Sequence, residues 1–190
     1  MQYRASSQLN DWRHRLWLSM LVAASVAFTL GLACAVPLAA FAAAAALTLS
    51  RRAALLLVGA VWLANQIIGY SCLGYPYNAN SLAWGAALGA VALLATVAAR
   101  AVALRVERTG SLMTPLASFA AAFAVYEGAL FIVAVVALGD TGSFTPAIMG
   151  RIFIINAVAM LGLLVLNRLA IASGLVAAPS PRLSMIETHA

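Results

Sequence analysis

Long apolar runs, separated by short charged or turn-forming segments, dominate the chain. From Leu16 to Ser50 no residue is charged. Pro37 divides this run, because proline breaks a helix interior but suits the first turn of a new helix. A membrane-spanning helix needs about 20 apolar residues, and shorter spans occur. The pattern predicts an all-α bundle of six transmembrane helices at about 16–34, 37–50, 53–70, 81–99, 114–138 and 146–174.

Residues with capping chemistry stand at several predicted helix starts. Ser81 is a plausible N-cap, and Thr114-Pro115 and Thr145-Pro146 each place a capping threonine before a proline at the first helical position. Prolines and serines recur in 175–190, which reads as a flexible cytoplasmic tail. The chain is therefore predicted to form one membrane domain, 1–174, followed by this tail.

Composition supports a membrane protein over a soluble one. Hydrophobic residues make up 65% of the 190 residues and charged residues 8%, whereas soluble domains average about 45–50% and about 25%. These values exclude a disordered chain and a disulfide-stapled secreted module, and they identify an integral membrane protein.

Charge gives an orientation. The chain has eleven basic residues, all arginine, and a net charge of +6. Because cytoplasmic loops are enriched in basic residues, six spans with both termini in the cytoplasm fit best. Arg151 alone then lies outside, and arginines scattered between apolar runs argue against a nucleic-acid-binding face. The inner arginines are Arg4, Arg13, Arg15, Arg51, Arg52, Arg100, Arg105, Arg108, Arg168 and Arg182.

The sequence leaves two questions about the N-terminal region open. Arg13 and Arg15, followed by an apolar stretch and Ala33-Cys34-Ala35, also fit a cleavable signal peptide. Cys34 and Cys72 both fall near the predicted outer side, where they either pair or stay free.

Polar and aromatic residues gather in the predicted outer half. Trp62, Gln66 and Tyr70 share a stripe at i, i+4 and i+8, with Asn65 beside it, and Trp84 opens the next helix. Such groups stack on a planar ligand and hydrogen-bond its edge. The alternatives are an interfacial aromatic belt and interhelical hydrogen bonds.

Glu127 is predicted near the middle of a membrane helix, where ionisable groups are costly and mark either a site or a pair. Phe123 and Phe131 flank it at i−4 and i+4. Arg151 is the one cation expected within reach, and Asn156 lies closer to its level. The two interpretations are a structural contact that locks two helices and a role in ligand binding or ion coupling.

The sequence lacks the residues that several kinds of binding site require. The two histidines, His14 and His189, lie at the ends of the chain, outside every predicted span. Intramembrane haem ligation, a histidine-based zinc site and a phosphate-binding loop are therefore not expected. We expect no enzyme activity, no metal and no cofactor.

The layout resembles the substrate-capture (S) component of energy-coupling factor vitamin transporters. The resemblance covers the whole chain as topology and rests on short segments. These are Ser50-Arg51-Arg52-Ala53-Ala54-Leu55 entering the third helix, Tyr75-Pro76, Trp84-Gly85 with Gly89, Ala98-Ala99-Arg100, and Ala23-x-x-x-Ala27, the family's packing motif. The short, alanine-rich second helix departs from the family, and no single vitamin is indicated.

The resemblance implies a component of a bacterial inner (plasma) membrane that captures a small molecule from the outer side. A transmembrane coupling subunit, packed on Ala23 and Ala27, and its ATPases would supply the energy. The implied substrate-binding residues are Trp62, Asn65, Gln66, Tyr70, Trp84, Glu127, Arg151 and Asn156. The alternative is a non-catalytic accessory or assembly subunit of a larger membrane complex; an enzyme acting on lipid ranks last.

Overall fold

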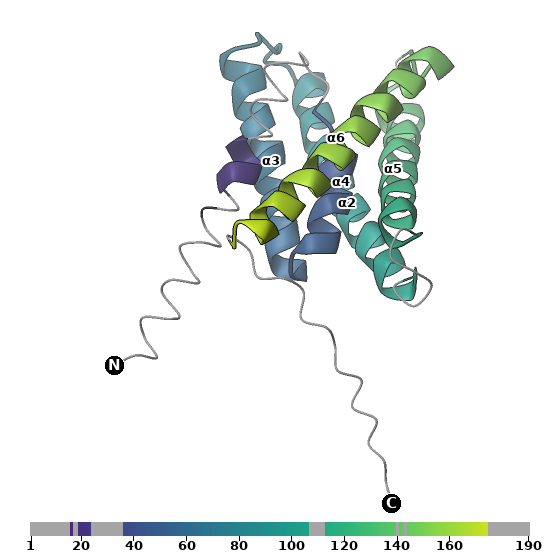
Figure 1. Cartoon of the computed structure of the whole chain (residues 1–190). Coiled ribbons are helices and arrows are strands. Elements are labelled where there is room, and N and C mark those ends of the chain that lie inside the picture. The colour runs from purple at the N-terminus through teal and green to yellow at the C-terminus, as the bar shows by residue number, and fades with distance from the viewer. Residues whose placement is uncertain are drawn as a thin grey trace, which may run out of the picture.

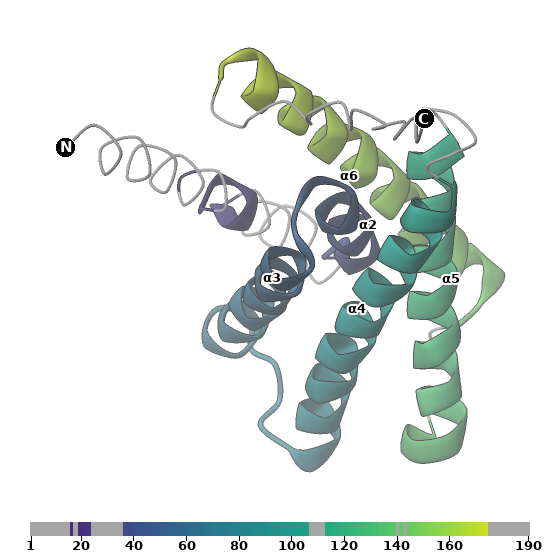
Figure 2. The ribbon, with the colours of Figure 1, turned by 90° about the horizontal axis from the view of Figure 1, so that it is seen from below.

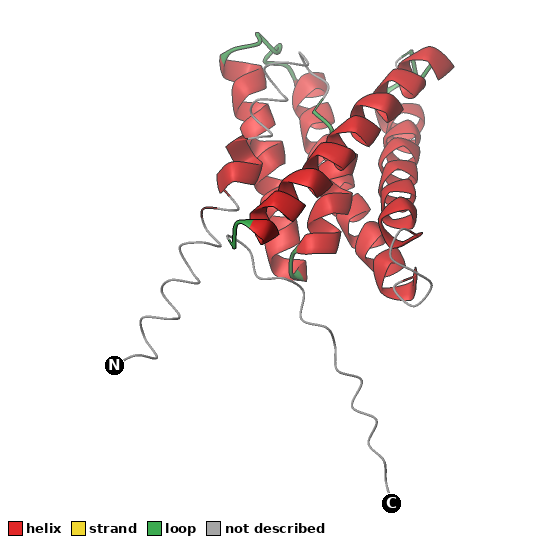
Figure 3. Ribbon diagram, in the orientation of Figure 1, coloured by secondary structure: helices red, strands yellow, loops and turns green. Residues whose placement is uncertain are grey.

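The computed structural model describes residues 16, 19–23, 36–106, 113–139, 141–142 and 144–174. Helices make up nearly all of this part of the chain, and it contains no strand (Figures 1 and 3). Of the predicted first helix, only Leu16 and 19–23 are described, and they are helical. The rest of that helix, with Ala27 and Cys34, and the predicted tail lie outside the described residues.

Five α-helices follow along the described chain. Four of them, one extended by a π-helix, are long and apolar enough to cross a membrane. These four helices indicate a helical membrane protein, and the total of six membrane spans stays a prediction. The elements are α2 Leu38–Thr48, α3 Arg51–Ser71, α4 Ala79–Val106, α5 Met113–Val133 with the π-helix η1 Ala134–Leu138, and α6 Pro146–Ala172.

Side-chain caps explain where some helices begin. The Thr145 hydroxyl accepts from the Ile148 amide at 3.4 Å ahead of Pro146, which confirms the predicted start of α6. The prediction of Ser81 as an N-cap is wrong. α4 begins at Ala79, and Asn78 Oδ1 accepts from the Ser81 amide at 2.8 Å, while the Ser81 hydroxyl turns to another partner.

α4 continues to Val106, well past residue 99, where the sequence predicted its end. The prediction stopped at Arg100 because the apolar run ends there. However, a helix ends where its backbone loses partners, and Arg, Ala, Val and Leu are all tolerated within a helix. Arg100 therefore lies inside α4, about two turns from its end, and can reach toward its neighbours.

α2 occupies the centre of the bundle. Seen along the bundle, α3, α4, α5 and α6 surround it, and each of them contacts it (Figure 2). Leu38 through Ala46 are all buried. Alanines let the surrounding helices approach closely, which is how helices pack tightly in a membrane. At 1.5 Å per residue the helix is about 16 Å long, roughly half of a hydrocarbon core.

The two ends of α2 are capped by side chains from other helices. Its N-cap residue, Pro37, offers no side-chain hydrogen bond; Asn156 Oδ1 of α6 accepts from the Ala40 amide at 3.0 Å instead. At the other end, Arg100 Nη1 of α4 donates to the Leu49 carbonyl at 2.9 Å and to Ala46 at 3.4 Å. Backbone groups at helix ends need such partners, above all where water is excluded.

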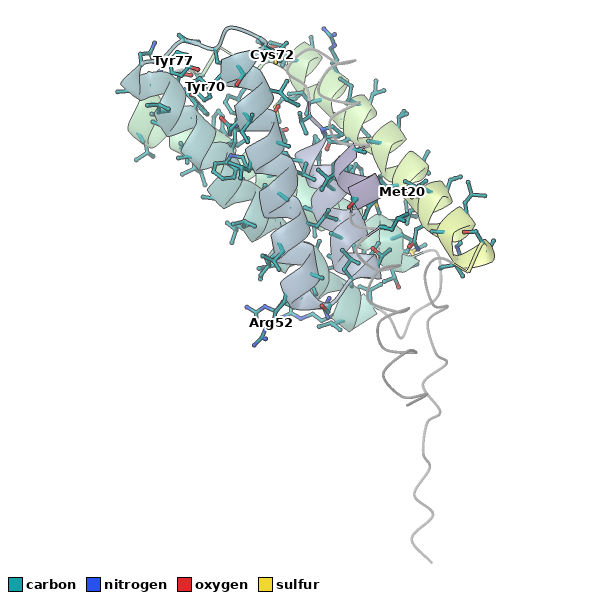
Figure 4. All side chains as sticks on the ribbon, turned by 90° about the vertical axis from the view of Figure 1, so that its left-hand side faces the viewer. Met20, Arg52, Tyr70, Cys72 and Tyr77 are labelled. Carbon is teal, nitrogen blue, oxygen red and sulfur yellow. The ribbon has the colours of Figure 1, made fainter. Side chains whose placement is uncertain are left out.

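The described arginines divide between the two halves of the bundle. Arg52 lies at one end of α3, opposite the end that carries Tyr70 and Cys72 (Figure 4). α2 and α4 also end toward the Arg52 end, where α3 and α5 begin (Figure 1). Toward it lie Arg51, Arg52, Arg100, Arg105 and Arg168, and only Arg151 among the described arginines lies in the other half. We call these the arginine-rich end and the opposite end.

Candidate functional site

The predicted stripe on α3 faces α4. The Trp62 Nε1–H donates to the Gly85 carbonyl at 2.8 Å, and its ring lies on Gly89. A Cβ added to Gly89 would stand 2.6 Å from the indole, so this close approach requires glycine. The small-residue spacing on α4 thus marks a tight α3–α4 contact, and Trp62 is used within it.

Tyr70 belongs to an aromatic cluster that closes the opposite end of α3. Its hydroxyl pairs with the Ser81 hydroxyl at 3.0 Å. Its ring lies 5.7 Å from Tyr75 and 5.1 Å from Tyr77, between ring centroids. The Tyr77 hydroxyl donates to the Tyr70 carbonyl at 3.1 Å, and the two rings lie together in Figure 4. These contacts hold the α3–α4 connection on the helix ends.

Two amide side chains on α3 keep unused hydrogen-bonding atoms. Asn65 is 5% exposed, and its Oδ1 has no partner among the described residues. Gln66 Nε2 is likewise buried without a partner in the described part of the chain, although Gln66 Oε1 lies close to Gly85. A buried polar atom left unpaired costs about 1–3 kcal/mol. Both residues therefore have capacity for a further partner.

Glu127 is buried within α5. It is 5% exposed, and within the described residues it forms no hydrogen bond or ion pair. Arg151, the predicted partner, is exposed on α6. The described residues therefore do not form the predicted Glu127–Arg151 pair. The two phenylalanines on either side of Glu127 have different surroundings. Phe123 packs on Phe153 of α6, with ring centroids 5.1 Å apart, whereas Phe131 is 45% exposed.

Asn156 forms no hydrogen bond with Glu127. Both ends of its amide are used elsewhere, because Oδ1 caps α2 at Ala40 and Nδ2 donates to the Ile152 carbonyl at 3.0 Å. The suggested Glu127–Asn156 contact is therefore replaced by an α6–α2 contact. Trp84 also packs partly buried against the core, and Ala23 is exposed.

Asn65 and Glu127 stand equally far along their own helices. Each stands about 21 Å along its helix from the arginine-rich end, at 1.5 Å per residue. α2 spans only about 16 Å from the same end. The helical rise from the arginine-rich end to either residue therefore exceeds the length of α2, which contacts both α3 and α5. We call Asn65, Gln66 and Glu127 the mid-depth polar residues.

Two cavities lie at the arginine-rich end, away from every predicted site residue. One, of about 240 Å³, lies between α3 and α4. The other, of about 280 Å³, lies between the end of α2, α4 and Thr114 of α5. Arg100 lines both. Sequence reasoning missed Arg100, since its one signal was an arginine at the end of an apolar run, which the positive-inside rule already explained.

Metal-binding chemistry is not assembled in the described part of the chain, where no three His, Cys, Asp or Glu side chains gather. Cys72, exposed beyond the end of α3, is a free cysteine. Comparison with known proteins found no matching protein family, no matching curated protein and no matching solved structure.

Proposed function

We propose that this chain is a membrane-embedded binding protein that holds a small molecule at the level of the mid-depth polar residues. The observation that carries the proposal is Glu127, an acidic residue that is 5% exposed and forms no hydrogen bond or ion pair within the described residues. An ionisable group at membrane depth is costly and marks a functional site unless a structural partner satisfies it. Here the predicted structural partners, Arg151 and Asn156, are exposed or used elsewhere.

The unused atoms indicate the chemistry of the ligand. Asn65 Oδ1, which is buried without a partner among the described residues, accepts hydrogen bonds, and Gln66 Nε2, in the same situation, donates them. The Glu127 carboxyl, which forms no hydrogen bond within the described residues, accepts them when ionised. A ligand with N–H or O–H donors and at least one acceptor would satisfy all three.

The resemblance to S components of energy-coupling factor transporters extends this proposal to uptake of a vitamin or cofactor precursor. The arginine-rich end would face the cytoplasm by the positive-inside rule, so that the mid-depth polar residues would be reached from the outer side. A coupling subunit and ATPases would then drive release. This extension rests on the sequence segments that carry the resemblance.

A second candidate is an accessory subunit that assembles with other membrane proteins. The observation that favours it is that several polar side chains form hydrogen bonds between helices of the bundle. Trp62, Tyr70 and Asn156 each bond to another helix or helix end. In that case the predicted site residues serve folding and assembly, and no ligand is bound.

Native mass spectrometry of the protein, purified in mild detergent from its host, distinguishes the two. A stoichiometric small molecule in the wild type, lost in Glu127→Gln and Asn65→Ala, supports binding. The matched control is Asn80→Ala, an exposed amide at the start of α4, which should keep the molecule. Copurified subunits without a small molecule would contradict the proposal and favour the accessory subunit.

A further inference from the structure

The cavity between α3 and α4 is an apolar groove open at the surface. Ala54 and Thr96, both buried, form its floor, and Leu55, Val97 and Leu104 line its sides. Val97, Ala101 and Leu104 are exposed, so the groove faces outward from the bundle. Since α3 and α4 are both long enough to cross a membrane, it faces the lipid.

The floor of this groove offers no free polar group. Thr96 is the one hydroxyl residue that lines it, and its Oγ1 donates to the Ala92 carbonyl of its own helix at 2.8 Å. The surface presented by the floor is therefore hydrocarbon. Pockets for whole small molecules usually measure about 300–1,000 Å³. At about 240 Å³, this groove suits a segment of an acyl chain better than an entire metabolite.

Two arginines line the same groove. Arg51 is the first residue of α3 and is exposed. Arg100 is half-buried, and its hydrogen bonds to α2 use only Nη1, so the other N–H donors of the guanidinium remain for a ligand. Among the described residues Glu127 is the one acidic side chain, and it lies on α5, outside this groove. No acidic side chain therefore lines the groove beside these two arginines.

We propose that this groove binds one anionic phospholipid. An acyl chain lies along Ala54 and Thr96, and the phosphate is held by Arg51 and Arg100. The pairing of a basic mouth with an apolar floor is the complement of such a lipid: basic pockets between membrane helices bind anionic headgroups, at about 1 kcal/mol per arginine near the surface. The proposal does not depend on the function proposed above.

The test is lipid titration followed by native mass spectrometry of the full chain in detergent. Phosphatidylglycerol should form a one-lipid complex in preference to phosphatidylcholine, which has the same acyl chains and no net charge. Arg51→Gln should weaken the phosphatidylglycerol complex about fivefold, the factor that corresponds to one arginine. Ala101→Trp, which fills the exposed side of the groove, should also weaken it.

Controls separate the groove from charge and bulk in general. Arg168→Gln removes an exposed arginine at the same end, and Ala90→Trp adds the same bulk at an exposed α4 position outside the groove. Both should bind phosphatidylglycerol as the wild type does. Equal binding of the two lipids, or full binding by both Arg51→Gln and Ala101→Trp, would overturn the proposal. The caps of α2 come from Asn156 and Arg100, so the Arg51 variant keeps them intact.

Discussion

Asn156 Oδ1 accepts a hydrogen bond from the Ala40 amide across 3.0 Å, and so a residue of the last described helix caps the first turn of the central one. An asparagine is a good N-cap within its own chain segment because it satisfies an amide that lacks a helical partner. Here the same chemistry is supplied from another helix. Pro37, which starts α2, has no side-chain oxygen or nitrogen for the task.

Replacing Asn156 with leucine should therefore destabilise the protein by about 1 kcal/mol, which is the usual effect of losing a cap. The measurement is thermal unfolding in detergent. Asn80→Leu is the matched control, since Asn80 is exposed at the start of α4, and it should leave stability within about 0.5 kcal/mol. Equal stability of the two variants would show that the Ala40 amide finds another partner.

Arg100 should be harder to replace than an arginine at a membrane surface usually is. Arg100→Gln removes the donor that reaches the Leu49 and Ala46 carbonyls, which leaves the C-terminal end of α2 without this cap. We expect faster amide hydrogen exchange in the last turn of α2, with α6 unchanged. Arg105→Gln, an exposed arginine on the same helix, is the control. Unchanged exchange in α2 would contradict the capping role.

Two glycine-to-alanine variants should change the stability of the protein in opposite directions. At Gly89 a Cβ would meet the Trp62 indole at 2.6 Å, so Gly89→Ala must push α3 and α4 apart and destabilise the protein. At Gly59 of α3 nothing lies within 4 Å, and Gly59→Ala should stabilise the helix by about 0.5–1 kcal/mol. Thermal unfolding of both variants, measured under one condition, checks the pair. A shift in the same direction for both would contradict the packing described here.

We expect Glu127 to lower the stability of the ligand-free protein. Glu127→Leu removes a carboxyl that forms no hydrogen bond or ion pair within the described residues, at a position that is 5% exposed, and we expect the ligand-free protein to become more stable. Residues at binding sites often carry such a trade-off. The measurement is thermal unfolding of ligand-free protein, with Glu127→Gln as the polar comparison. A loss of stability in Glu127→Leu would indicate that the carboxyl has a structural partner.

Arg151→Gln should change stability by no more than about 0.5 kcal/mol, because Arg151 is exposed. A double-mutant cycle with Glu127→Gln checks this, and the two effects should add. A coupling energy well above the error of additivity, about 0.3–0.5 kcal/mol, would restore the ion pair that the sequence suggested.

Local signals allowed much of the helix pattern to be predicted. Thr145 and Pro146 stand next to each other, and the cap they form needs only neighbouring residues. Pro37 marks the start of α2 for the same reason. Asn78 competes with Ser81 over a few residues, and sequence alone did not show that the Ser81 hydroxyl would be taken by Tyr70 of the preceding helix.

The site residues were harder to interpret, because their roles depend on which helices become neighbours. Spacing on α3 correctly placed Trp62, Gln66 and Tyr70 on one face, but it did not show that this face packs on Gly85 and Gly89. The roles of Asn156 and Arg100 were hard to predict for the same reason. Nothing near either residue in sequence indicates that both serve the ends of α2.

The capping of α2 also has a consequence for the order in which the chain is completed. The chain is made from its N-terminus, and α2 is too short to span a membrane by itself. Arg100 follows Leu49 by 51 positions, and Asn156 follows Ala40 by 116. α2 therefore leaves the ribosome before both of its capping side chains, and its first turn waits for the final described helix.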